Sequence, residues 1–344
     1  DSRNTANELQ NHAFLMLKPH ANNETARKYI HKYLDDHGIE ILEAGEITAE
    51  DIAKGSLIDT HYGSLADKAF IDPRDLAVPL DGQERFEECF GISWDRALKE
   101  DLVCNAKEAQ KRLGWTSTEL GTNWDKLKLG LGKVKFGGGF YCGNLQGFYV
   151  INGFYMAMRA KYLSPDSSVH WFCLRWQSSK LSWETFREEV IGETDPATAA
   201  EEHPGSLRGH FFNKWCELGL SAQPHVGDNV IHGSASPLEA LSERITWLNY
   251  SLAKDPFGLL LKDRGITHMD VREWQQNPTV EMDGRKCPLF DHLENKDTSD
   301  CLSCLQTVQR LLLKKPLHKE VGIYTNSDLL RFLLNTTSSR KCLS

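Results

Sequence analysis

The sequence lacks several features that would mark particular classes of protein. No apolar run approaches the ~20 residues that a membrane-spanning helix needs, so we expect no membrane span. Basic residues are in the minority, since 40 Lys and Arg face 48 Asp and Glu, and the net charge of −8 disfavours binding to nucleic acid. No internal repeat is present. A chain of 344 residues therefore predicts two domains, or one domain with large additions.

A regular cysteine framework is also missing. The nine cysteines are scattered, which is typical of free thiols, so we expect the cytoplasm or another reducing compartment. The chain begins at Asp1 without a methionine, which leaves room for a targeting segment that has been removed. Four candidate zinc ligands stand near the C-terminal end: Cys287, His292, Cys301 and Cys304. Only one CxxC pair is among them, so thiols at a helix start are the alternative.

Short apolar or alternating runs and helical spacing predict the main elements. Strands are expected at 12–19, 39–47 and 169–177. Helices are expected at 21–38, 48–70, 182–192 and 236–248. Between them, residues 86–114 favour charged helices, and the glycine-flanked alternation at 126–147 favours a hairpin. The glycine run there is no phosphate loop, because the Gly-x4-Gly-Lys-Ser/Thr pattern is absent.

The stretch DNVIHGSAS, residues 228–236, places His232 where a short β-branched run ends. Ser236 then caps a helix, so the positive end of that helix follows closely after the histidine. Glu243 comes seven residues after Ser236, which is two helical turns, so its carboxylate can reach back to one imidazole nitrogen. The other nitrogen would be free to attack. The alternative is a structural histidine, with the glutamate paired to a cation on a solvated face.

Three more side chains suit a phosphate group. Lys18 ends the first predicted strand, Thr194 offers a hydroxyl, and Arg208 presents a planar fork between two glycines. Each has a plainer alternative as a surface residue.

Taken in order, these motifs resemble those of nucleoside diphosphate kinases. The family's Asn-x-x-His-Gly-Ser-x-Ser is matched over residues 229–236, with Glu243 seven residues later. Its Gly-Glu-Thr-x-Pro and Arg-Gly-x-Phe are matched at 192–196 and 208–211. The remaining matches are Lys18-Pro19, His61-Tyr62 and Phe70. The resemblance covers about residues 11–71 and 168–250.

The resemblance implies an α+β fold with a ferredoxin-like antiparallel sheet and helices on one face. Residues 72–167 would then be an inserted α/β segment, and residues 251–344 a mostly helical C-terminal extension. The expected role of this insertion is packing or a dimer interface, and the alternative is a second recognition surface over the pocket.

The resemblance also implies an activity. His232 would take the γ-phosphate of a nucleoside triphosphate and pass it to a nucleoside diphosphate, with Glu243 and Ser234 orienting the imidazole. Mg²⁺ would bridge the phosphates, and homo-oligomerisation stays open. The residues implied to contact phosphate, sugar or base are Lys18, Tyr62, Phe70, Thr194, Arg208 and Asn229.

Two departures from the family pattern affect this activity. Glu188 stands where the family has an arginine, and a slip of one residue would bring Arg187 there instead. Ala235 replaces an aspartate beside the histidine. Two alternatives to the kinase therefore stay open: a non-catalytic nucleotide-binding scaffold or sensor, and an enzyme for another phosphorylated substrate.

Overall fold

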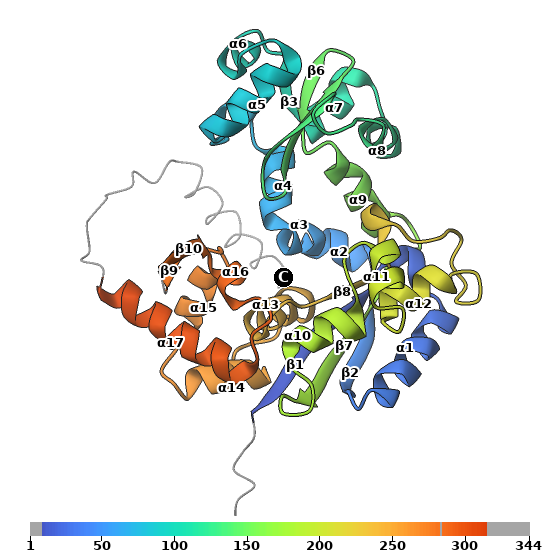
Figure 1. Ribbon diagram of the computed structural model, residues 1–344, viewed down its shortest axis with the longest axis vertical. Helices are drawn as coiled ribbons and strands as arrows, with labels where there is room; N and C mark the ends of the chain where they lie inside the picture. Colours follow the sequence, from blue (N-terminus) through green and yellow to red (C-terminus); the bar gives the residue numbers. More distant parts are fainter. Residues whose placement is uncertain (1–8, 283, 315–344) are drawn as a thin grey trace, which may run out of the picture.

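The computed structural model describes residues 9–282 and 284–314, and a four-stranded antiparallel sheet holds the predicted strands (Figure 1). Its strands are β1 (Gln10–Leu17), β2 (Glu40–Thr48), β7 (Ser168–Gln177) and β8 (Ile231–Gly233). They lie in the order β2-β7-β1-β8, and each neighbouring pair is antiparallel. With the helices that flank this sheet, the predicted α+β class is confirmed.

Helices precede or follow each of these strands. They are α1 (Glu24–Asp36), α2 (Ala49–Gly55), α3 (Leu57–His61), α4 (Gly63–Phe70), α10 (Trp183–Thr185), the π-helix Phe186–Ile191, α11 (Pro196–Glu202), α12 (Leu207–Asn213) and α13 (Pro237–Leu248). The single helix expected over 48–70 is thus three helices. Ser56 adopts a left-handed conformation with φ of 50°, which ends the first of them because a right-handed helix cannot continue through it.

Side chains of β1 alternate between two hydrophobic cores, one on each face of the sheet. Leu15 and Leu17 pack on the face that α1, α12 and the π-helix cover. Phe14 and Met16 pack on the other face, with side chains of α2, α3 and α13. All four are fully buried, as the period of a strand between two layers requires. Helices therefore cover both faces of the sheet, whereas the resemblance implied one.

Residues 72–167, which we call the insertion lobe, carry a second sheet in the order β3-β6-β5-β4. Its strands are β3 (Val103–Asn105), β4 (Lys133–Gly137), β5 (Phe140–Leu145) and β6 (Phe148–Ile151), of which β3 and β6 are parallel. Its helices are α5 (Leu80–Phe90), α6 (Trp94–Lys99), α7 (Ala106–Leu113), α8 (Ser117–Asp125) and α9 (Phe154–Leu163). Figure 1 shows this lobe standing apart from the main sheet, with α4 and α9 running between the two. The hairpin predicted over 126–147 is β4 and β5.

The C-terminal extension is described as far as Lys314, and the rest of the predicted range 251–344 lies outside the described residues. It contains α14 (Pro256–Lys262), α15 (His268–Trp274), β9 (Thr279–Met282), β10 (Arg285–Pro288), α16 (Leu289–Leu293) and α17 (Thr298–Lys314). A buried ion pair joins it to α13, because Arg244 Nε lies 2.5 Å from Asp255 Oδ2. Over the described ranges, no helix combines the length and apolar character that crossing a membrane requires.

Candidate active site

A cavity of about 1170 Å³ lies where β1 ends and the antiparallel strand β8 begins. It gathers seven residues singled out from the sequence: Lys18, Tyr62, Arg187, Thr194, Arg208, Asn229 and His232. Two further candidates, Glu243 and Ser234, contact His232 or its carboxylate partner from behind. One candidate, Phe70, does not line this cavity. The cavity also takes residues from the insertion lobe and, through Asn295, from the C-terminal extension.

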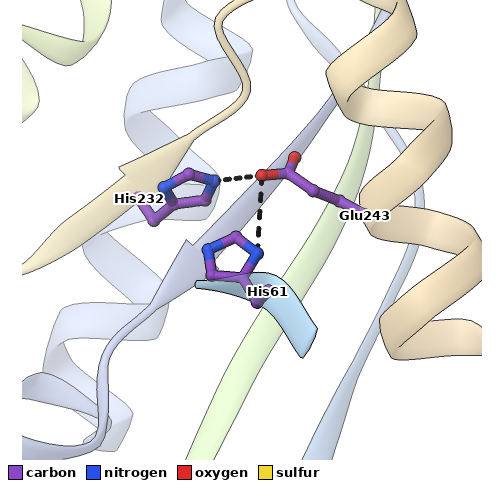
Figure 2. Close-up of side chains that lie close together, drawn as sticks. All are labelled: His61, His232 and Glu243. Atoms are coloured by element: carbon purple, nitrogen blue, oxygen red, sulfur yellow. Dashed lines mark hydrogen bonds and ion pairs between the residues drawn. The ribbon is translucent and has the colours of Figure 1, made fainter. Parts of the chain in front are cut away.

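His232 is held in one orientation by a chain of buried hydrogen bonds. Its Nε2 atom is hydrogen-bonded to Glu243 Oε1, and the other ring nitrogen points away from this carboxylate (Figure 2). Ser234 Oγ donates to the second oxygen, Glu243 Oε2, at 2.5 Å and accepts the backbone N–H of Phe14 at 3.0 Å. A carboxylate fixed in this way keeps the proton of the imidazole on Nε2 and leaves the lone pair on Nδ1.

A second histidine, His61, completes this cluster. Its Nδ1 atom lies 3.8 Å from Glu243 Oε1, and its ring stands perpendicular to that of His232 with centroids 4.7 Å apart. Burial lowers the pKa of His61 to about 3 and that of His232 to about 4, so both rings are neutral at pH 7. Burial raises the pKa of Glu243 to about 7. Sequence reasoning assigned His61 no role, although the His61-Tyr62 pair had marked its position.

Among the described residues, His61, His232 and Glu243 are the one group of His, Cys, Asp or Glu that could hold a metal ion, with ligand atoms within 4.8 Å of one another. Two imidazole nitrogens and a carboxylate oxygen suit zinc better than Mg²⁺, which prefers oxygen ligands.

The four candidate zinc ligands near the C-terminal end do not come together. Cys287, His292, Cys301 and Cys304 are all described, yet they make no ligand cluster within the range that the structure covers. Cys301 lies on α17 inside the core of the extension, and burial raises the pKa of its thiol well above the usual range. His292 Nε2 instead contacts the carbonyl oxygen of Val280 at 3.3 Å.

Two cations border the nucleophilic face of the cavity. Lys18 Nζ donates to Asn229 Oδ1, and Asn229 Nδ2 in turn donates to the carbonyl of Thr194 at 2.9 Å. Burial, and next the charge of Arg208, lower the pKa of Lys18 to about 8. These contacts link the end of β1 to the loop before β8 and to the loop between the π-helix and α11.

Arg208 is anchored by two backbone carbonyls. Its Nη1 donates to Gly192 at 2.7 Å and its Nη2 to Ile231 at 2.9 Å, while its buried Nε has no hydrogen-bond partner in the protein. Burial lowers the pKa of the guanidinium to about 10, so it stays charged at neutral pH. A buried N–H without a partner is costly unless a ligand satisfies it.

An irregular helix precedes Gly192, and it affects which residue takes the position of the expected arginine. Residues 186–191 form a π-helix, closed by the Gly192 N–H donating to the carbonyl of Arg187 at 3.0 Å. A π-turn holds one residue more than an α-turn, which is an offset of the kind required for Arg187 to replace Glu188. Both side chains line the cavity. Arg187 Nη1 is paired with Glu294 at 2.5 Å and with Asn295 at 2.7 Å, both in the extension.

Two glutamates that line the cavity, Glu239 and Glu193, were not expected as site residues. Glu239 accepts the backbone N–H of Ala235 at 3.0 Å, and burial, followed by the charge of Glu243, raises its pKa to about 7. Glu193 Oε1 contacts His203 at 2.6 Å, while its Oε2 is buried without a hydrogen-bond partner. Glu193 belongs to the Gly-Glu-Thr motif, so the sequence did mark its position.

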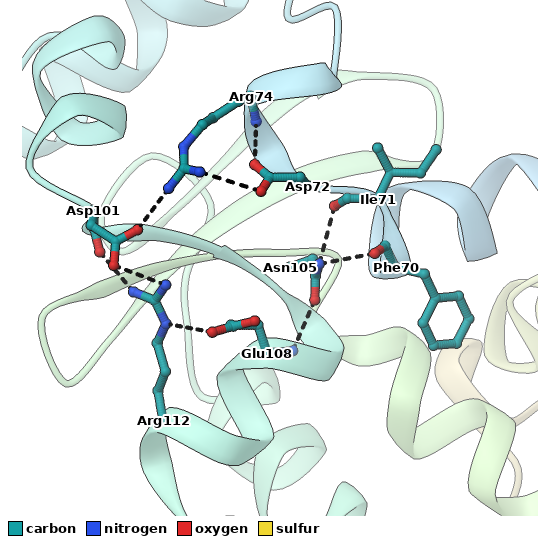
Figure 3. A network of polar contacts seen from close by, with 8 residues as sticks. All are labelled: Phe70, Ile71, Asp72, Arg74, Asp101, Asn105, Glu108 and Arg112. Atoms are coloured by element: carbon teal, nitrogen blue, oxygen red, sulfur yellow. Dashed lines mark hydrogen bonds and ion pairs between the residues drawn. The ribbon is translucent and has the colours of Figure 1, made fainter. Parts of the chain in front are cut away.

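Phe70 does not line the cavity. Asn105 Nδ2 donates to the carbonyls of Phe70 and Ile71 at 3.0 and 3.1 Å, which ties the end of α4 to the insertion lobe (Figure 3). Nearby, Arg112 bridges Asp101 and Glu108 on the lobe surface. The phenyl ring packs in the lobe core, edge-on to Tyr155.

Comparison with known proteins gives only distant structural likenesses. No protein-family model matches the chain, and no curated protein matches its sequence. Solved structures that match include the nucleoside diphosphate kinase of Aquifex aeolicus, at 14% identity over 72% of this chain and 99% of that one, with a TM-score of 0.35. The kinase of Encephalitozoon cuniculi matches at 15% identity over 71% of this chain and 92% of that one, with a TM-score of 0.34. At such values the likeness carries no argument about function.

Proposed function

We propose that this protein is a phosphotransferase of the nucleoside diphosphate kinase type, working through a phosphohistidine at His232. One observation carries the proposal. The Nε2 atom of His232 is held by Glu243, and the ring lies in a cavity shared with Lys18 and Arg208. A neutral imidazole with one nitrogen fixed and the other free is an activated nucleophile, and the two cations suit a polyphosphate.

Transfer proceeds in two half-reactions. The Nδ1 lone pair of His232 attacks the γ-phosphorus of a nucleoside triphosphate, and the bond from that phosphorus to the β,γ-bridging oxygen breaks. The diphosphate leaves with the bonding electron pair. An acceptor diphosphate then attacks the phosphohistidine in the reverse sense, so no water takes part. Glu243 offsets the positive charge that develops on the imidazole, and Ser234 holds the carboxylate in place.

Side chains near the end of β1 and the start of β8 would bind the phosphates. Arg208 offers its unpartnered Nε–H, Lys18 supplies a second positive charge, and Asn229 holds the lysine in position. The sheet order β2-β7-β1-β8, with the first and third of its strands in the centre, agrees with the split βαβ arrangement that the motifs imply.

Mg²⁺ fits this site as a companion of the phosphates. The orphaned oxygen Glu193 Oε2 is a hard ligand of the kind that Mg²⁺ prefers, and Glu239 adds a second carboxylate to the cavity. When bound, the ion would neutralise charge on the phosphate oxygens. The imidazoles of His61 and His232 do not suit it.

A non-catalytic nucleotide-binding protein is the second candidate. Glu188 brings a negative charge to the cavity, and Arg187 is already paired with Glu294. Both features would weaken binding of a highly charged transition state more than binding of the nucleotide itself.

The test is transfer of radiolabelled γ-phosphate from a nucleoside triphosphate to the protein. We expect the wild type to take a label that is acid-labile and base-stable, and that a nucleoside diphosphate removes. His232→Ala should take none, while His268→Ala, at an exposed histidine of α15, should label normally. Nucleotide binding by the wild type without any label would support the second candidate and overturn the first.

A further inference from the structure

The insertion lobe provides an aromatic end to the same cavity. Trp124, Tyr141 and Phe154 line it. The rings of Trp124 and Phe154 have centroids 6.0 Å apart, and those of Tyr141 and Phe154 are 6.2 Å apart and nearly perpendicular. Tyr141 and Phe154 are half-buried, so part of each ring is available to a ligand.

Trp124 is tightly packed at the aromatic end of the cavity. A side chain added at Gly153 or Gly143 would meet the indole ring of Trp124 at 2.5 and 2.9 Å, so the ring packs directly on backbone. Lys133 lies over the same ring at 5.3 Å, and burial lowers the pKa of its ammonium. Lys133 and Asp125 both border the cavity and add a hydrogen-bond donor and an acceptor beside the rings.

Helix α9 links the aromatic end to the other end of the cavity, which we call the phosphate end and which contains Lys18, Arg208 and His232. Phe154, Ala157, Met158 and Lys161 all line the cavity, and their spacing of three, four and seven residues places them on one helical face. Lys161 pairs with Asp228 at 2.9 Å, close to Lys18, whose pKa it helps to lower. From Phe154 to Lys161 the helix rises roughly 10 Å. A nucleotide spans a separation of this order between its terminal phosphate and its base.

We propose that the insertion lobe binds the base of the nucleotide, with Phe154 and Tyr141 as the stacking residues and Trp124 as their support. The inference rests on the function proposed above, because the phosphates must lie at Lys18 and Arg208. Aromatic side chains stack on the π-face of any base, so this end accepts several bases. Phe70, the residue expected to stack, is half-buried against the lobe core and does not line the cavity, and the aromatic end takes its place.

The charge distribution of the cavity favours this ligand class. One end offers cations, the other offers rings, and a nucleotide carries its phosphates and its planar base in the same arrangement. The volume of about 1170 Å³ is also above the ~300–1,000 Å³ typical of small-molecule sites, so a whole nucleotide fits together with bound water.

Calorimetric titration with ATP and with inorganic tripolyphosphate separates the two ends. We expect Phe154→Ala to weaken ATP binding by about 10-fold or more while leaving tripolyphosphate unchanged, because only ATP has a base to stack. Lys18→Met should weaken both ligands. Phe148→Ala is the matched control, since this half-buried phenylalanine of the lobe packs against Arg112 outside the cavity, and both ligands should bind it as they bind the wild type.

The other outcomes of these titrations decide between the base site and the phosphate site. Unchanged ATP affinity in Phe154→Ala and in Tyr141→Ala, with circular dichroism like that of the wild type, overturns the base site and leaves the phosphate site standing. If Phe154→Ala does not fold, Tyr141→Ala and Phe154→Leu provide the same comparison at smaller structural cost. A wild-type protein that binds neither ATP nor tripolyphosphate overturns the proposed function, and the base site with it.

Discussion

The two ends of the cavity are built in different ways. At the phosphate end, polar side chains stand at strand ends and in the loops beside them, and hydrogen bonds over short distances hold His232, Glu243 and Lys18. At the aromatic end, rings from separate elements of the insertion lobe meet through packing. The comparison teaches that the spacing of residues along the chain can position reactive side chains. The groups available to select a ligand depend instead on how the insertion lobe folds beside the site.

The largest expected effect comes from Glu243→Gln, which breaks the phosphate end alone. An amide can still bond to the imidazole but no longer offsets its positive charge, so we expect phosphorylation of His232 to slow by roughly 100-fold. Single-turnover labelling measures this rate. ATP affinity should stay within a few-fold of wild type, because the aromatic end is intact.

Glu184→Gln is the control for this variant, because Glu184 is exposed in the first turn of α10 and does not line the cavity. A labelling rate in Glu243→Gln equal to that of Glu184→Gln would show that the buried carboxylate only supports the fold.

A smaller effect is expected from pH, again at the phosphate end. The pKa of Lys18 is lowered to about 8, so its charge is present below that pH and is lost as the pH rises through it. The pKa of His232 is lowered to about 4, so the ring stays neutral and nucleophilic well below its usual range. Burial raises the pKa of Glu243 to about 7, so the carboxylate charge that offsets the charge on the imidazole is lost as the pH falls through that value. Labelling at subsaturating ATP should therefore be highest between about pH 7 and pH 8, and fall on either side.

Lys18→Arg tests the assignment of the alkaline limb. An arginine keeps its charge through this range, so the fall above pH 8 should move to higher pH even if the maximal rate drops. An alkaline limb that stays in place in Lys18→Arg would assign it to another group.

The smallest effect is expected at the aromatic end. A Cβ atom at Gly121 would come within 2.4 Å of Ala157 Cβ, so Gly121→Ala must push α8 away from α9 and loosen the ring cluster. We expect ATP affinity to fall by a few-fold while tripolyphosphate affinity and the labelling rate at saturating ATP are kept. An equal loss for both ligands would mean that the two ends are mechanically coupled.

Spacing along the chain predicted the parts of the site that local geometry determines. Glu243 reaches His232 because both belong to one strand–turn–helix segment, and two helical turns return its side chain toward the histidine. Lys18 and Arg208 were identified for the same reason, since each stands where a short element begins or ends. Three of the four strands of the main sheet were predicted from apolar or alternating runs, apart from shifts of one to two residues at their ends.

The rest depended on contacts that spacing does not encode. Phe70 matched a motif, but Asn105 draws the end of α4 into a lobe whose fold is set elsewhere. Cys301 stood at a suggestive distance from Cys304 in the sequence, yet α17 turns it into a hydrophobic core. The lobe was expected to serve packing, and nothing in the spacing of Trp124 or Phe154 indicated that they face the cavity of His232.

The ion pair between Arg244 and Asp255 has a consequence for synthesis of the chain. Arg244 adjoins Glu243 on α13, so the helix that orients the histidine is anchored to a residue translated after it. Glu294 and Asn295, which hold Arg187, are translated later still. A nascent chain whose main sheet and insertion lobe have already left the ribosome therefore still lacks the contacts that hold α13 and Arg187 in place. We expect phosphotransfer competence to arise only after residues 294 and 295 have left the ribosome.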